Sequence, residues 1–217
     1  MRKAIRRFAG LVFLLNGLAR AAAGDFDPAL LRDGDLIFQT SRSSQSQAIQ
    51  LATHSRYSHC GLVYFRHGKP YVFEASTKVK QSPFKRFVGK GDGKRFVIKR
   101  LKNADSLLTR EALRKMEAEG KKIEGLPYDT WFGWGDDRIY CSELIYKIYW
   151  KALAVEIGKT AHLRDFDLTH PVVKATLEAR YHGNIPMDET VISPAALFED
   201  PNLNEIFNNY GADTAGS

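Results

Sequence analysis

One stretch, residues 140–153, reads YCSELIYKIYWKAL and has the clearest periodicity in the chain. Its apolar side chains recur three or four residues apart, which is the spacing that gathers side chains on one face of an α-helix. The residues on this face are Cys141, Leu144, Ile145, Ile148 and Ala152. We therefore expect a helix from Cys141 to about Leu153 that buries this face. At the start of a helix, free backbone N–H groups and the positive end of the helix dipole favour a negatively charged sulfur.

Short apolar runs on either side of this helix predict the rest of the fold. We expect strands at residues 36–38, 57–65, 70–75 and 95–101. Further helices are expected at residues 45–52, 109–122 and 172–181, and a short one after Ser193-Pro194. A small antiparallel sheet with flanking helices is typical of an α+β domain.

Three residues in separate elements are candidates for thiol catalysis. A cysteine nucleophile needs a base to take its proton and a third group to orient that base. His59 lies in the strand at 57–65 and Glu74 in the following strand. The turn at residues 67–69 is expected to set the two opposite each other, about 5 Å apart. From the residues alone, simpler roles remain open: Cys141 as a core residue, His59 as a packed or surface residue, and Glu74 as an edge-strand charge.

The second cysteine of the chain, Cys60, adjoins His59. Successive side chains of a strand point to opposite faces of the sheet, so Cys60 is expected to point away from a site that His59 faces. It would then be a core residue that forms no disulfide with Cys141. His54, His59, Cys60 and Cys141 also lack the paired close spacing of structural zinc ligands. We therefore predict neither a metal site nor a cofactor.

Residues 1–23 have the pattern of a secretory signal peptide. A basic segment comes first, an apolar run from Phe8 to Leu15 follows, and Ala21-Ala22-Ala23 fits a cleavage site. We expect export to the periplasm or the cell exterior. The mature domain is then expected at residues 24–210, with a frayed tail at residues 211–217.

Much of the positive charge of the chain lies in that N-terminal segment. The formal net charge is +7, and residues 1–23 hold five basic residues and no acidic one, which leaves +2 for the rest. Nucleic acid is therefore not an expected partner. A basic stretch at residues 78–94 is a candidate for peripheral contact with anionic cell-wall or lipid surfaces.

Five short motifs occur along the chain in a specific order and spacing. They are Gly34-Asp-Leu-Ile-Phe38, Ser58-His-Cys-Gly-Leu-Val63, Val72-Phe-Glu-Ala75, Gly125-Leu-Pro-Tyr-Asp129 and Tyr140-Cys-Ser-Glu-Leu-Ile145. Together, over roughly residues 33–200, the chain resembles the YiiX/YebB-like cysteine hydrolases, a permuted branch of the NlpC-like papain superfamily. The resemblance implies a circularly permuted papain-like fold, in which the histidine precedes the orienting residue and the cysteine.

The resemblance also implies roles for individual residues. Cys141 is the implied nucleophile, His59 the base and Glu74 the orienting residue. Tyr140 matches the aromatic position before the cysteine and is a candidate for lining the site. The backbone N–H of Cys141 is a candidate oxyanion donor, because the oxygen of the intermediate must lie near the start of the helix.

The implied reaction is acyl transfer to water through a thioester on the cysteine. NlpC-like relatives cleave peptide amides of the cell wall, whereas more distant permuted relatives move acyl chains between lipids. Three hypotheses follow: an exported amidase that cleaves a cell-wall peptide or similar substrate, a lipid-directed thioesterase or acyltransferase, and a non-enzymatic binding module. A narrow polar cleft beside the cysteine would favour the first, and a wide apolar groove the second.

Overall fold

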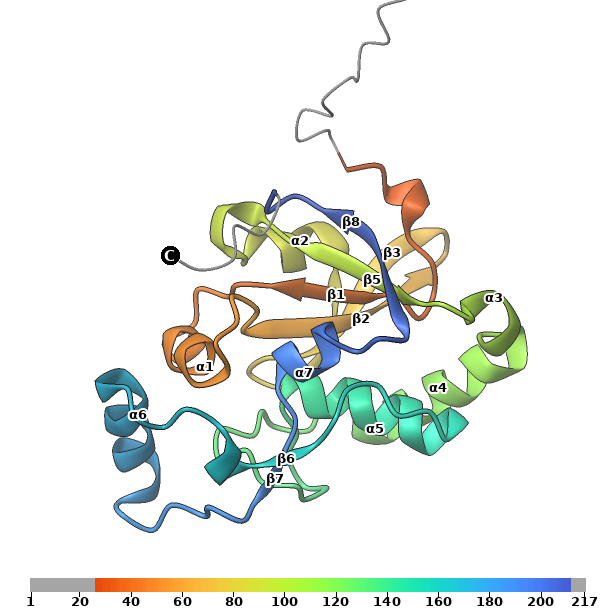
Figure 1. The fold of residues 1–217 in the computed structure, drawn as a ribbon. Helices are drawn as coiled ribbons and strands as arrows, with labels where there is room; N and C mark the ends of the chain where they lie inside the picture. Colours follow the sequence, from red (N-terminus) through yellow and green to blue (C-terminus); the bar gives the residue numbers. More distant parts are fainter. Residues whose placement is uncertain (1–25, 212–217) are drawn as a thin grey trace, which may run out of the picture.

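The computed structural model describes residues 26–211. The predicted signal peptide at residues 1–23 lies outside the described residues, as does the predicted tail beyond Gly211. Within the described part, six strands form one sheet in the order β4-β3-β2-β1-β5-β8, and every neighbouring pair is antiparallel (Figure 1). The strands are β1 (Leu36–Gln39), β2 (His59–Arg66), β3 (Lys69–Ala75), β4 (Val79–Pro83), β5 (Val97–Leu101) and β8 (Leu203–Asn208).

Helices cover both faces of this sheet (Figure 1). Helices α4 and α5 lie on one face, α2 lies on the other, and α1 packs beside α6. None of the described helices is long and apolar enough to cross a membrane. The helices are α1 (Ser46–Thr53), α2 (Phe84–Gly89), α3 (Ala104–Leu107), α4 (Arg110–Ile123), α5 (Cys141–Leu153), α6 (Pro171–Tyr181) and α7 (Pro194–Phe198); β6 (Ala161–His162) and β7 (Thr190–Val191) form a separate two-stranded sheet. The α+β prediction is confirmed.

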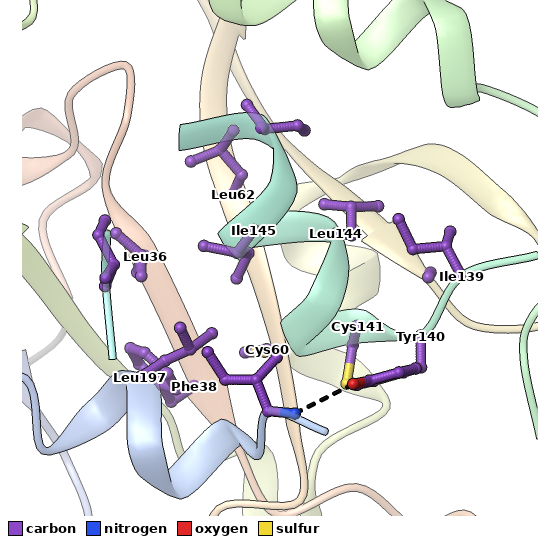
Figure 2. Close-up of a cluster of buried hydrophobic side chains, with 14 of the residues drawn as sticks. Leu36, Phe38, Cys60, Leu62, Ile139, Tyr140, Cys141, Leu144, Ile145 and Leu197 are labelled. Carbon is purple, nitrogen blue, oxygen red and sulfur yellow. Dashed lines mark hydrogen bonds between the residues drawn. The ribbon is translucent and has the colours of Figure 1, made fainter. Parts of the chain in front are cut away.

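The two faces of the sheet contribute to two apolar layers. Along β1, Leu36 and Phe38 face the larger cluster beneath α5, which includes Ile145 (Figure 2). Ile37, between them, faces the smaller cluster that includes Phe87 of α2. This alternation follows from the two-residue period of a strand, and it buries β1 on both sides.

Helix α5 has the bounds that its sequence periodicity predicts. The residue before it, Tyr140, is extended, with φ −104° and ψ 171°. Cys141 is therefore the first helical residue. The helix ends at Leu153, because Ala154 takes a left-handed conformation with φ 54°.

The register of the β2–β3 hairpin differs from the prediction by two residues. The strands pair Leu62 with Phe73, so the same register continued by one residue sets Glu74 opposite Gly61 rather than His59. The reason is the turn, which consists of only His67 and Gly68, both with positive φ (49° and 72°), as tight two-residue hairpins require. A shift of two residues preserves the face on which a side chain lies, so His59 and Glu74 remain diagonal neighbours on one face.

Candidate active site

Two hydrogen bonds of Tyr140 hold the start of α5, where Cys141 lies. The backbone N–H of Tyr140 donates to Oε2 of Glu143 at 3.3 Å, which closes the first turn of the helix. The Tyr140 hydroxyl accepts from the backbone N–H of Ile192 at 3.1 Å, drawn as the dashed line in Figure 2. Cys141 is only 2% exposed, so its sulfur is presented to the interior of the site rather than to bulk solvent.

The structure brings His59 and Glu74 into direct contact. His59 Nε2 lies 2.8 Å from Oε2 of Glu74, whose side chain is fully buried. The His59 ring also stacks on Phe87, with the ring centroids 5.2 Å apart. Because Nε2 is engaged by Glu74, Nδ1 is the ring nitrogen left for Cys141, with which the His59 side chain also forms a hydrogen bond.

Two further residues hold Glu74. Its Oε1 accepts from the Ser82 hydroxyl at 2.5 Å and from the Lys90 ammonium at 3.0 Å. Both lie in the basic stretch that the sequence predicts only as a surface for anionic contacts. No local pattern marks them, because they reach Glu74 through the β3–β4 pairing and the end of α2.

The protonation states of the three residues are set by these contacts. Burial opposes a charge on His59, but the hydrogen bonds to Cys141 and Glu74 outweigh it and raise the pKa of His59 to about 9. Burial likewise opposes ionisation of Glu74, but the hydrogen bond and the charge of His59 lower its pKa to about 2. A hydrogen bond from Cys60 is the largest cause that lowers the pKa of Cys141; burial opposes it, and His59 adds to it. These shifts all favour the charged forms, a thiolate, an imidazolium and a carboxylate, in the site.

Cys60 is a buried core residue that forms no disulfide, as predicted, but the expectation that it points away from the site is wrong, because it lies close to Cys141. Strand alternation does place His59 and Cys60 on opposite faces, since His59 lies against Phe87 while Cys60 joins the cluster beneath α5. That second face is the one on which α5 lies, so Cys60 meets Cys141. Both cysteines are buried free thiols.

Two hollows of different character meet at the site. A cleft of about 550 Å³ contains His59, Glu74 and Lys90 and is lined mostly by polar residues, although apolar atoms make up the larger part of its exposed surface; the hydroxyl residues are Ser41, Ser43, Ser44, Ser58, Ser76, Thr77, Tyr128 and Thr130. A smaller cavity of about 90 Å³ reaches Cys141 from between α1 and α6, and the exposed surface of its walls is entirely apolar. Tyr140 also lines this cavity.

Gln45 and Tyr128 line both hollows and therefore lie between them. Gln45 Nε2 donates to the Tyr128 hydroxyl at 2.8 Å, so the hydroxyl hydrogen of Tyr128 remains available to another acceptor. Burial, followed by the nearby charge of Cys141, raises the pKa of Tyr128 and keeps it a donor. Neither residue was predicted as part of the site; the only signal was the place of Tyr128 in the motif at residues 125–129.

This fold and this arrangement of a thiol, an imidazole and a carboxylate define a cysteine hydrolase of the permuted papain-like class. The chain belongs to the permuted papain-like amidase family YaeF/YiiX (C92), whose model matches residues 30–207. A relative in Escherichia coli (strain K12), the uncharacterized protein YiiX, is 47% identical over 173 residues, which cover 80% of this chain and 84% of that protein. The crystal structure of metalloprotein yiiX from Escherichia coli O157:H7 matches with a TM-score of 0.78 and 46% identity, over 82% of this chain and 97% of that chain.

These matches confirm the resemblance, the fold and the class of enzyme predicted from the sequence, a cysteine amidase or peptidase-type hydrolase. One name among them calls the solved relative a metalloprotein. In residues 26–211 of this chain, no group of three or more His, Cys, Asp or Glu side chains is placed to hold a metal ion. The described residues therefore do not fit a resident metal, and the mechanism below uses the chain's own groups.

Proposed function

We propose that this chain is an exported cysteine amidase in which Cys141 attacks the carbonyl carbon of an amide and forms a thioester. The observation that carries the proposal is the linked set of Cys141, His59 and Glu74 at the junction of the two hollows. The low pKa of Cys141 supplies a nucleophile, and the raised pKa of His59 supplies an acid for the leaving amine.

The reaction has two stages. In the first, the Cys141 thiolate bonds to the carbonyl carbon, and the carbonyl oxygen takes the negative charge; the C–N bond then breaks as His59 Nδ1–H protonates the departing amine. In the second, His59 takes a proton from water, the hydroxide attacks the thioester, and the thiolate leaves. Glu74 stays ionised throughout and holds the imidazole through Nε2.

We propose two donors for the negative oxygen. The backbone N–H of Cys141 belongs to the first turn of α5 and has no partner within the helix. The Tyr128 hydroxyl, fixed by Gln45, is the second donor that we propose.

The two hollows favour a peptide amide over a long-chain lipid. The larger cleft, whose lining residues are mostly polar and include the cations Arg42 and Lys90, suits the charged and hydrogen-bonding groups of a cell-wall peptide. The apolar cavity of about 90 Å³ is smaller than a cavity of about 150 Å³ that holds benzene, so it suits a short apolar side chain. Its apolar lining also makes an acyl-lipid the second candidate substrate, provided that α1 and α6 separate to admit a longer chain.

Trapping of the acyl-enzyme tests the function and distinguishes the two substrates. The full mature chain is mixed with a cell-wall peptide amide or with a long-chain N-acyl amide, quenched in acid, and weighed by mass spectrometry. The proposal expects a mass increase equal to the acyl group, located on Cys141, with the peptide arm giving the larger yield. Turnover with no adduct, or an adduct on another residue, contradicts it; a larger yield with the lipid favours the second candidate.

Export is proposed from the pattern of residues 1–23. Terminal sequencing of material recovered from the periplasm is expected to begin at Gly24. Recovery of the chain only in the cytoplasm, with Met1 retained, would remove this part of the proposal.

Replacement Tyr128→Phe is expected to lower kcat about 10²–10³-fold, because one donor to the developing oxyanion is lost. KM is expected to change little, since the ring remains. The alkylation rate of Cys141 by iodoacetamide is expected to stay at the parent value, because that reaction develops no oxyanion.

A matched control is Tyr64→Phe. The Tyr64 hydroxyl is buried without a hydrogen-bond partner among the described residues, and it borders a different hollow. This variant is expected to retain full activity. Equal losses in the two variants would show that the hydroxyl of Tyr128 has no special place in the reaction.

A further inference from the structure

The mechanism leaves one nucleophilic group unused, the thiol of Cys60. Cys60 is the second residue of β2, pairs with Phe38 of β1, and is fully buried. Its side chain lies beneath α5 in the same cluster as Cys141 (Figure 2). The chain contains no third cysteine, so the two thiols that it has are neighbours in the structure.

Cys60 contacts the nucleophile in two ways. The Cys60 thiol and the Cys60 backbone N–H are both causes that lower the pKa of Cys141, by hydrogen bonding toward its sulfur. His59, the residue before it, contacts the same sulfur and lies against the opposite face of the sheet. Two consecutive residues of one strand therefore supply the base and a second side-chain donor to one atom.

A buried thiolate needs such donors. Cys141 is 2% exposed, so water contributes little to its solvation, and a buried charge without hydrogen bonds is costly. Burial, and then the contact with Cys141, raise the pKa of Cys60, so Cys60 keeps its proton and acts as a donor. A thiol is a weak donor, which stabilises the neighbouring thiolate without suppressing its reactivity as a strong donor would.

We propose that Cys60 is a positioning residue, whose thiol donates a hydrogen bond to the Cys141 sulfur, keeps it ionised and fixes its direction toward the substrate. The inference rests on the role of Cys141 proposed above. The other titratable or charged groups around the sulfur are His59 from β2, Tyr128 from the preceding loop, Tyr140 before α5 and Arg180 from α6.

The test is the pH dependence of Cys141 alkylation by iodoacetamide, followed on the Cys141 peptide by mass spectrometry. In Cys60→Ala the midpoint is expected to rise by about one pH unit, the size expected for loss of one hydrogen bond to a charged group. At pH values below both midpoints the rate should fall about tenfold. In Cys60→Ser, which keeps a donor of similar size, the midpoint should stay at or below that of the parent.

Leu62→Val is the matched control for packing. Leu62 lies two residues further along β2, in the same cluster beneath α5, and is 7% exposed. Its shortening perturbs this core but removes no donor, so thermal stability should fall without a shift of the midpoint. An unchanged midpoint in Cys60→Ala, or equal shifts in Cys60→Ala and Leu62→Val, would overturn the proposal.

The test gives a clear answer even if one variant does not fold or if no substrate is found. If Cys60→Ala does not fold, Cys60→Ser alone decides, because a rise of its midpoint contradicts a donor role. Alkylation needs no substrate, so the shift can be measured even if the acyl-enzyme is never trapped. Failure of the amidase proposal and failure of the Cys60 proposal are therefore distinguishable.

Discussion

Replacement of Cys141 by alanine is expected to abolish amide hydrolysis and leave the fold intact. Loss of the nucleophile of a catalytic triad lowers kcat by about 10⁶-fold, so the remaining rate should be close to the detection limit. The fold should survive because alanine favours helix and because Cys141 is the first residue of α5, not part of its middle. The measurement is kcat/KM on a chromogenic peptide amide, with a thermal melt of each protein.

The thermal melt also measures how the ionised Cys141 sulfur affects the stability of the fold. The contacts that lower the pKa of Cys141 outweigh the cost of its burial, so the ionised sulfur stabilises the folded state at neutral pH, and Cys141→Ala should unfold at a somewhat lower temperature than the parent. A variant that remains folded and retains more than a tenth of the parent rate would rule out Cys141 as the nucleophile.

Replacement of His59 by alanine is expected to cause the second largest loss, about 10⁴-fold or more in kcat, because neither the departing amine nor the attacking water then has a proton-transfer partner. The Cys141 thiolate also loses the imidazolium beside it, so its alkylation midpoint should rise. In the parent protein, the raised pKa of His59, about 9, gives the direction of the pH effect. The imidazolium is present below that pH, so kcat should fall as the pH rises through about 9.

Two comparisons accompany the His59 variant. Glu74→Gln should cost less than His59→Ala, because the amide oxygen still accepts from Nε2 of the imidazole. His54→Asn should cost nothing, since the side chain of His54 is 75% exposed and asparagine tolerates its left-handed backbone conformation, with φ 49°. If His59→Ala resembled His54→Asn, the base would have to be sought elsewhere.

The sequence predicts elements whose patterns are local. Both the start and the end of helix α5 could be predicted, because its apolar stripe is continuous and begins at Cys141. Strands β4 and β8 and helix α2 were not predicted. In the β4–α2 segment, Phe84 and Phe87 are buried, but basic residues lie between and beside them. These basic residues obscure the regular spacing of apolar side chains that would indicate a buried element. From its sequence the segment therefore resembles an exposed surface, although it packs on the sheet.

The residues of the candidate site also fall into those that the sequence indicates and those that only the packing reveals. The order of His59, Glu74 and Cys141, together with the resemblance, led to the three residues that the structure brings together. Ser82 and Lys90 could not be found, because their contact with Glu74 depends on how distant segments pack. For Cys60, alternation along the strand was deduced correctly, but no local pattern tells which face of the sheet a later helix will cover.

The place of β8 has a consequence for the order in which the chain acquires its structure. β8 (Leu203–Asn208) pairs with β5 (Val97–Leu101), so the strand that completes the sheet is synthesised about a hundred residues after its partner. Pairings between such distant segments form slowly. A nascent chain that stops short of Leu203 has an unpaired β5 edge and an unfinished core. For the export proposed above, this order leaves the chain unfinished, and therefore open to machinery that threads unfolded polypeptides, until synthesis reaches β8.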